Sequence, residues 1–190
     1  KGENVNCQNI IKNLSYIMEE FFKNKGDLFQ RLTDRICESL KAGRKILVFG
    51  NGGSAAQAQH FCAELVNKFL IDRPAICAIS LTTDTSALTS IANDYSFDYV
   101  FSRQIEALGT KVDTAIGLST SGNSPNVIAA IKTAKKRGLL TAAFTGEGGG
   151  KLASLPDFLI DVPSEETPRI QEIHLILLHI LAQKIEKELS

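Results

Sequence analysis

This 190-residue sequence has no excess of either positive or negative charge. Its 21 lysine and arginine residues balance 21 aspartate and glutamate residues, so the formal net charge is zero. A neutral chain has no broad electrostatic surface for nucleic acid or for an anionic membrane. The balance therefore argues against a nucleic-acid partner, and any anion that the protein binds must be held by groups placed locally around it.

Paired cysteines and long apolar runs are also missing. The four cysteines form no CxxC pair, which argues against a disulfide framework and a thiolate zinc site and suits a reducing compartment. The chain begins on a polar stretch without an apolar signal core. The apolar stretch at 173–182 is far shorter than the ~20 residues that cross a bilayer. We expect a cytoplasmic enzyme or binding protein that has no membrane partner.

What the sequence does contain is an alternation of short apolar runs and helical patterns. Apolar residues make up 44% of the chain, and its length fits one domain, 1–190, better than two. Two helices are expected in an N-terminal segment, 1–43, and an α/β core over 44–190. The expected helices lie at 5–23 and 28–41, from the GNGGSAA loop that begins at residue 50 to about residue 68, and at 85–92, 97–108, 125–137 and 168–188. The expected strands lie at 46–49, 75–80, 114–118, 140–144 and 158–162.

Fully apolar strands that alternate with helices are typical of a parallel sheet covered on both faces. The sequence therefore predicts an α/β fold, a three-layer sandwich with a five-stranded parallel sheet flanked by helices. On such sheets, ligands bind beyond the carboxyl ends of the strands.

The sharpest local pattern is STSGNSP at residues 119–125, which follows a predicted strand and precedes a predicted helix. Ser124 suits the N-cap position, and Pro125 suits the first helical position. The helix then offers free N–H groups and a positive dipole end, the serines add hydroxyl groups, and Gly122 lets the backbone approach an anion closely. An ordinary capped turn is the alternative. Three serines at the end of a strand favour a phosphate site.

Two glycine-rich stretches resemble nucleotide-binding loops without meeting their requirements. Residues 50–55, GNGGSA, match the dinucleotide fingerprint, but the next predicted strand ends without the acidic residue that would bind the ribose. Residues 146–151, GEGGGK, are similar to a Walker A loop. However, Thr145 replaces its first glycine and Leu152 replaces the required Ser or Thr. Neither stretch predicts a bound nucleotide.

Histidine and glutamate residues supply the candidate proton-transfer groups. His60 and Glu64 are four residues apart and share one face of the helix that starts at the glycine loop, although a solvated pair is the alternative. On the last helix, His179 lies about 80° around the axis from Gln171, and His174 lies about 60° away on the other side. Helical periodicity does not choose between these two histidines.

Four stretches together resemble the phosphoheptose isomerases of the sugar isomerase (SIS) superfamily: GNGGSAAQAQH, LTTDTSAL with ANDY, STSGNSP and TPRIQEIHLILLH. The resemblance covers nearly the whole chain and implies the SIS fold. It also implies conversion of sedoheptulose 7-phosphate to D-glycero-D-manno-heptose 7-phosphate, the entry step to the nucleotide-activated heptoses of lipopolysaccharide or capsule. It further implies a homotetramer with active sites between subunits and a zinc ion (Zn²⁺) in each site.

The same resemblance assigns residues by motif. The sugar phosphate would contact Asn51, Gly52, Gly53, Glu64, Asn93, Asp94, Ser119, Thr120, Ser121, Ser124 and Gln171. Zinc would be held by His60, Glu64, Gln171 and His179. Glu64 is the expected base and His179 the expected acid of a reaction that proceeds through an enediol. For His174 we expect a packing role or a role behind the site.

Two other functions would share the glycine and serine loops: a non-catalytic SIS protein that binds a replication initiator, and a sugar-phosphate sensor. Non-catalytic members tend to lose the glutamate at the position of Glu64. Here Glu64, Gln171 and His179 are all present, which favours the enzyme. The residues before Lys45 contain no DNA-binding pattern, and together with the zero net charge this disfavours the sensor.

Overall fold

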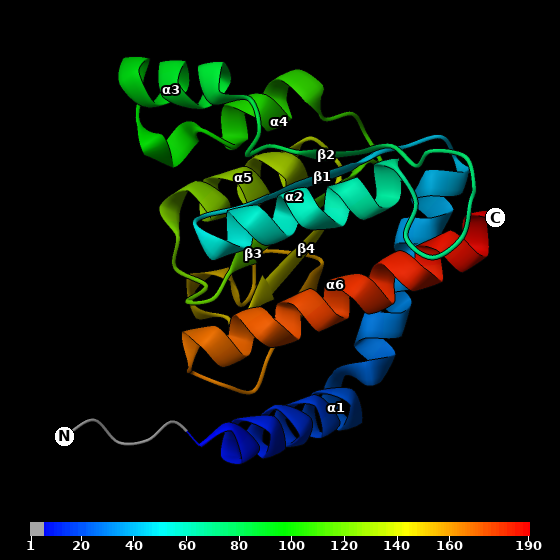
Figure 1. Cartoon of the computed structure of the whole chain (residues 1–190). Coiled ribbons are helices and arrows are strands. Elements are labelled where there is room, and N and C mark those ends of the chain that lie inside the picture. The colour runs from blue at the N-terminus through cyan, green and yellow to red at the C-terminus, as the bar shows by residue number, and fades with distance from the viewer. Residues whose placement is uncertain (1–5) are drawn as a thin grey trace.

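The computed structural model describes residues 6–190 and shows a parallel sheet between two layers of helices (Figure 1). The strands are β1 (Ile46–Gly50), β2 (Ala78–Ser80), β3 (Thr114–Ser119), β4 (Leu140–Thr145) and β5 (Phe158–Asp161). They pair in the order β2-β1-β3-β4-β5, and every pair is parallel. The predicted fold class and five-stranded sheet are confirmed.

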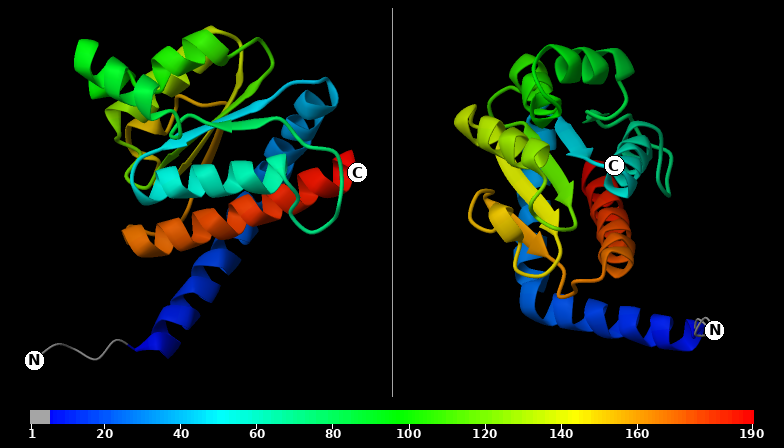
Figure 2. Two further views of the ribbon diagram at one scale, coloured as in Figure 1. Left: turned by 45° about the horizontal axis from the view of Figure 1, so that its top comes forward. Right: turned by 90° about the vertical axis from the view of Figure 1, so that its left-hand side faces the viewer.

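Two helical layers bury the two faces of this sheet (Figure 2). The helices are α1 (Cys7–Lys41), α2 (Gly53–Val66), α3 (Thr85–Asp94), α4 (Ser102–Leu108), α5 (Pro125–Lys136) and α6 (Thr167–Leu189), and two short 3₁₀ helices span Phe97–Tyr99 and Gly150–Leu152. Because side chains alternate along a strand, Val48 packs with α1, α2 and α6, while its neighbour Phe49 packs on the side of α3 to α5. Within residues 6–190, no helix is long and apolar enough to cross a membrane.

The N-terminal segment corrects the prediction of two helices. α1 continues from Cys7 to Lys41 without ending at Gly26, and Figure 2 shows that it bends part-way along its length. A glycine inside a helix costs only about 1 kcal/mol. Phe21 and Phe29, on either side of Gly26, are both fully buried and meet edge to face with ring centroids 6.2 Å apart. This packing outweighs the local preference for a break.

Two other boundaries differ from the predictions. The stretch 97–108 is not one helix, because the 3₁₀ helix at Phe97–Tyr99 precedes α4, which begins at Ser102. Ser96 caps that 3₁₀ helix by accepting a hydrogen bond from the backbone N–H of Asp98 at 3.2 Å. The strand expected from residue 75 begins only at Ala78, where this edge strand first pairs with Ile46.

The strand order places a switch point between β1 and β3. The chain leaves β1 toward β2 on one side and leaves β3 toward β4 on the other, while Gly50 and Leu118 are direct partners at the carboxyl ends. The loops after these two strands therefore lie next to each other. In open parallel sheets this is where ligands bind.

Candidate active site

The glycine loop joins β1 to α2 and brings the start of α2 against α6. Gly52 stands at the N-cap of α2 with a positive φ of 56°. A Cβ atom on Gly53 would lie 2.7 Å from Nε2 of Gln171, so the missing side chain is what lets the Gln171 amide lie there. One turn later, Nε2 of Gln57 donates a hydrogen bond to the backbone carbonyl of Gln171 at 2.6 Å.

The serine loop follows β3 and turns into α5. Ser124 occupies the N-cap and Pro125 the first turn, as predicted, but the Ser124 side chain does not cap the helix. Its hydroxyl lies 2.9 Å from the hydroxyl of Ser119, and the two share a hydrogen bond. The Ser121 side chain is exposed and accepts a hydrogen bond from the backbone N–H of Asn123. The loop thus presents several hydroxyl groups at the end of the sheet.

The glycine-rich stretch at 146–151 and Leu152, which follows it, hydrogen-bond to the serine loop. The backbone N–H of Gly146 donates to the carbonyl of Thr120 at 2.8 Å, and that of Leu152 donates to the carbonyl of Gly122 at 3.1 Å. Between these loops lies a pocket of about 270 Å³, lined by Thr120, Ser121, Gly146, Glu147, Ser164, Glu165, Thr167 and Ile170. No lysine or arginine is among the lining residues, so a phosphate there would be held by N–H and hydroxyl groups.

The glycine and serine loops are connected by a pair of asparagines. Nδ2 of Asn51 donates to Oδ1 of Asn126 at 2.9 Å, and Nδ2 of Asn126 donates to Oδ1 of Asn51 at 2.8 Å. Asn126 lies in the first turn of α5 and is 2% exposed. Sequence reasoning missed Asn126, because nothing local marks a partner 75 residues away.

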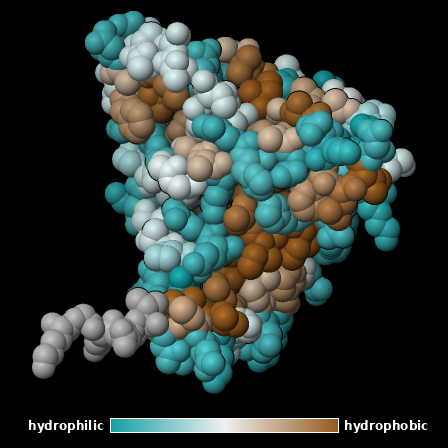
Figure 3. Space-filling view, viewed as in Figure 1, coloured by the Kyte–Doolittle hydropathy of each residue, from teal (hydrophilic) through white to brown (hydrophobic). Residues whose placement is uncertain are grey.

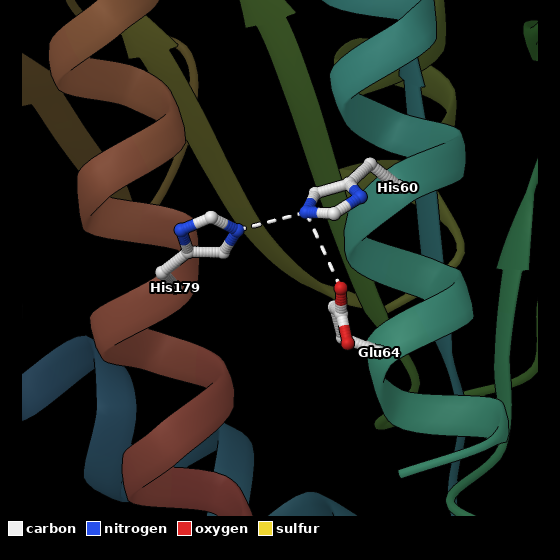
Figure 4. Close-up of side chains that lie close together, drawn as sticks. All are labelled: His60, Glu64 and His179. Atoms are coloured by element: carbon white, nitrogen blue, oxygen red, sulfur yellow. Dashed lines mark hydrogen bonds and ion pairs between the residues drawn. The ribbon is translucent and has the colours of Figure 1, made fainter. Parts of the chain in front are cut away.

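Three titratable side chains meet between α2 and α6 (Figure 4). Nε2 of His60 lies 3.3 Å from Oε1 of Glu64 on the same helix, as their spacing predicted, and 2.8 Å from Nε2 of His179 on α6. One of the two imidazoles therefore carries the shared proton and the other accepts it. His60 is exposed and Glu64 and His179 are half-buried, so the group is open to solvent.

Comparison with known proteins decides the family. The SIS domain model matches residues 10–146. The phosphoheptose isomerase of Desulfovibrio desulfuricans is 56% identical over 167 residues, which cover 88% of this chain and 80% of that protein. The solved phosphoheptose isomerase of Neisseria gonorrhoeae aligns with a TM-score of 0.88 and 42% identity, covering 95% of this chain and 96% of the other. The chain belongs to the phosphoheptose isomerase family.

Membership of this family makes the chain a sugar isomerase and confirms the predicted SIS fold. The phosphoheptose isomerase of Francisella tularensis has a TM-score of 0.90 at 32% identity, covering 95% of this chain and 96% of the other. The sugar isomerase domain of an RpiR transcription factor from Sphaerobacter thermophilus aligns with a TM-score of 0.64 at 21% identity, which shows a shared fold only.

The cluster between α2 and α6 fits a zinc ion. Two imidazole nitrogens and one carboxylate oxygen are a common catalytic zinc set, and the ligand atoms of His60, Glu64 and His179 lie within 4.8 Å of one another. Ligands about 2.1 Å from a tetrahedral zinc are roughly 3.4 Å apart. The 3.3 Å separation of His60 and Glu64 is close to that value, whereas the 2.8 Å between the two imidazole nitrogens would have to widen to hold the ion.

Other predicted site residues lie outside this cluster. The Gln171 amide packs against Gly53 and, being eight residues before His179, lies about two helical turns away from it. Asn93 and Asp94 end α3 in exposed positions, where Nδ2 of Asn93 donates to Oδ1 of Asp94 at 2.9 Å. Within residues 6–190, neither of them hydrogen-bonds to the cluster.

His174 takes the packing role that we expected. Its ring is fully buried against Phe144, Nε2 donates to the backbone carbonyl of Thr145 at 3.0 Å, and Nδ1 has no partner within residues 6–190. Burial lowers the pKa of His174 from 6.5 to about 4, although the bond to Thr145 opposes the shift. The imidazole is therefore neutral at physiological pH and separate from the cluster.

This buried histidine should make the fold sensitive to acid. Because its folded pKa lies below its unfolded pKa, its stabilising effect is present above pH 6.5 and is lost as the pH falls toward 4. We expect His174 to account for about 2 kcal/mol of the unfolding free energy lost between about pH 7 and about pH 4.5. Urea unfolding of wild type and His174→Leu at both pH values measures this difference. An equal loss in both proteins would contradict it.

Proposed function

We propose that this protein interconverts sedoheptulose 7-phosphate and D-glycero-D-manno-heptose 7-phosphate. The observation that carries the proposal is the group formed by His60, Glu64 and His179, on helices that start beside the glycine and serine loops. Family membership supports the same substrate class, since the relatives are named phosphoheptose isomerases. A non-catalytic SIS protein would have no use for a carboxylate in this position, so Glu64 favours the enzyme.

The reaction moves a carbonyl from C2 to C1 by moving protons. The Glu64 carboxylate takes the proton from C1, while the N–H of His179 protonates the carbonyl oxygen on C2, which leaves an enediol. Collapse of the enediol returns a proton to C2 from Glu64, and the O1 proton passes to His179. Ketose and aldose therefore differ only in where two hydrogens reside, and no other reactant is needed.

The loops would hold the part of the substrate that does not react. We assign the phosphate to Ser119, Thr120, Ser121 and Ser124, whose hydroxyl groups lie at the carboxyl end of β3 and the start of α5. The sugar hydroxyls are assigned to Asn51, Gly52, Gly53, Glu64, Asn93, Asp94 and Gln171. Binding energy from a remote phosphate can position the reacting carbons, which is how an uncharged loop contributes to rate.

Zinc is the metal that the donor set favours. His60, Glu64 and His179 would hold it, with the Gln171 carbonyl as a fourth ligand after its side chain leaves Gly53. A bound zinc ion would polarise the carbonyl and hydroxyl oxygens and so stabilise the negative charge of the enediol. Glu64 and His179 would then serve both as metal ligands and as the groups that move protons.

The assembly is proposed to be a homotetramer with sites between subunits, which would let residues such as Asp94 reach the site of a neighbouring copy. Ile11, Tyr16 and Phe22 expose apolar surface on α1, and Ile176 does so on α6. Figure 3 shows apolar side chains gathered on the surface between these two helices. Such surface on a chain with zero net charge is suited to contact with further copies.

We place this single-domain enzyme in the cytoplasm, at the entry to heptose synthesis for lipopolysaccharide or capsule.

The substrate assignment is tested by incubating the protein and zinc with sedoheptulose 7-phosphate in an NMR tube. We expect the anomeric signals of an aldose 7-phosphate to grow at the expense of the ketose. In D₂O, deuterium should appear at C2 of the product, because the proton removed from C1 can exchange while Glu64 holds it. A ketose that stays unchanged over hours would remove the proposal.

Metal dependence is a separate prediction. Exhaustive chelation should lower turnover by at least about 100-fold, because polarisation of the substrate oxygens is lost. Added Zn²⁺ should restore it, and Mg²⁺, which prefers oxygen ligands, should not. The measurement is the initial rate of aldose formation before and after metal addition. Full activity in the chelated protein would show that the cluster works without a metal.

A further inference from the structure

The two helices that carry the cluster are linked again at their far ends by a buried carboxylate. Glu186 lies on α6, seven residues after His179 and so on nearly the same face of the helix. Its two carboxylate oxygens accept the backbone N–H groups of Phe69 at 3.0 Å and Leu70 at 2.9 Å. The segment that follows α2 is therefore held directly against α6.

Arg73 completes this link from the other side. Its side chain is 1% exposed and that of Glu186 is 3% exposed, with Nε of Arg73 lying 3.4 Å from Oε1 of Glu186. The guanidinium donates to the backbone carbonyls of Glu64 at 2.8 Å and Leu65 at 2.7 Å, which belong to the last turn of α2. These carbonyls have no partner inside the helix. One ion pair thus joins the turn of α2 that carries Glu64 to the helix that carries His179.

Burial raises the pKa of the Glu186 carboxyl, but the N–H groups of the loop and the charge of Arg73 lower it further, so it lies below its usual range. Glu186 therefore remains an anion that accepts hydrogen bonds at physiological pH. These bonds hold the segment that contains Phe69 and Leu70 against α6.

That position places the ring of Phe69 on the imidazole of His179. The two rings are stacked, with centroids 5.5 Å apart and planes inclined by 29°. The His60 ring meets His179 edge to face at 5.0 Å. Within residues 6–190, the one hydrogen bond of the His179 ring is the bond to His60. Phe69 is the aromatic ring that stacks on the face of this imidazole.

We propose that Phe69 is a positioning residue that holds the His179 ring in the plane in which Nε2 faces His60 and Glu64. Histidines that bind metal are usually oriented by a hydrogen bond from their second nitrogen to a carboxylate or carbonyl. Here an aromatic stack takes that place, and Glu186 and Arg73 anchor the stack. The inference rests on the proposed role of His179 in the isomerase site.

The test compares three variants with wild type. Phe69→Leu keeps an apolar side chain but removes the flat ring face, and Phe69→Tyr retains that face. Phe158→Leu is the matched control, because Phe158 on β5 is also half-buried and packs against the same core. We measure the Zn²⁺ dissociation constant by competition with a chromophoric chelator, the kcat and KM for sedoheptulose 7-phosphate, and the ring-proton shifts of His179 in the metal-free protein.

In Phe69→Leu we expect the Zn²⁺ dissociation constant to rise at least about tenfold, as on loss of other groups that orient metal ligands. We expect kcat to fall about tenfold with KM within about twofold, since the phosphate loops are untouched. The His179 ring protons should lose the ring-current shift that stacking causes. Phe69→Tyr should behave as wild type, and Phe158→Leu should change stability alone.

Wild-type values for zinc affinity and His179 shifts in Phe69→Leu would overturn the proposal, as would equal losses in Phe158→Leu. Zinc affinity and ring shifts are measured without substrate. They decide the role of Phe69 even if the wild-type protein turns out to act on a different sugar phosphate.

Discussion

Replacing Glu64 with glutamine should lower kcat for the isomerisation by about 10³-fold, within the range that a positioned base contributes. The amide keeps the shape of the carboxylate and an oxygen that can face Nε2 of His60, 3.3 Å away in wild type. It has no basic oxygen that can take a proton from C1. Most of the affinity for sedoheptulose 7-phosphate should persist, because the serine loop holds the phosphate and only the sugar-hydroxyl contact assigned to Glu64 changes.

The distinguishing measurement is proton exchange. In D₂O, wild type should incorporate deuterium at C1 of the ketose and at C2 of the aldose. Glu64→Gln should incorporate deuterium at neither carbon within the same time. Glu64→Asp, which retains a carboxylate on a shorter chain, should have intermediate rates. Glu38→Gln is the matched control, since Glu38 is an exposed glutamate paired with Arg35 on α1. Rapid exchange by Glu64→Gln would assign the base to another residue.

Much of the fold could be predicted from the sequence because the central strands β1, β3 and β4 are buried on both faces and appear in the sequence as short apolar runs. The loops after residues 50 and 119 were located correctly, since glycine and serine residues interrupt those runs abruptly. The continuity of α1 could not be predicted locally. The glycine at position 26 favours a break, and only the buried contact of Phe21 with Phe29 shows why the helix continues.

The site, too, was predicted only where local spacing was sufficient. The spacing of His60 and Glu64 predicted a shared helix face, and the structure shows it. Periodicity left His174 and His179 as equal candidates, and the resemblance to the family favoured His179. The structure shows the physical difference. The His174 ring is buried and hydrogen-bonds to the backbone of Thr145 on β4, while the His179 ring contacts His60 on α2.

Contacts between segments far apart in the chain could not be predicted from the sequence. Asn51 and Asn126 are 75 residues apart, and Phe69 and Glu186 are 117 residues apart. Each of these residue types is ordinary in its local context. Their roles exist only where the two segments meet.

The second large effect is expected from Gly122→Ala in the serine loop. Gly122 has a φ of +64°, and a Cβ atom there would lie 2.1 Å from the carbonyl oxygen of Gly149. The Cβ atom is fixed to the backbone of residue 122 and the atoms it would meet are backbone too, so no flexible side chain can move aside. The clash would push the serine loop away from the glycine-rich stretch whose N–H groups bind Thr120 and Gly122. We expect KM for the sugar phosphate to rise about 100-fold or more, since several hydroxyl groups lose their positions together.

Gly148→Ala separates this clash from backbone strain. Gly148 has a φ of +73°, and a Cβ atom there would meet nothing within 4 Å. Alanine in the left-handed region costs roughly 1–2 kcal/mol, so both variants should lose that much unfolding free energy in urea. Gly122→Ala should lose a further ~1–3 kcal/mol through overpacking, and it alone should lose affinity for the sugar phosphate in calorimetry. Equal affinity in the two alanine variants would show that the serine loop does not hold the phosphate through the geometry seen here.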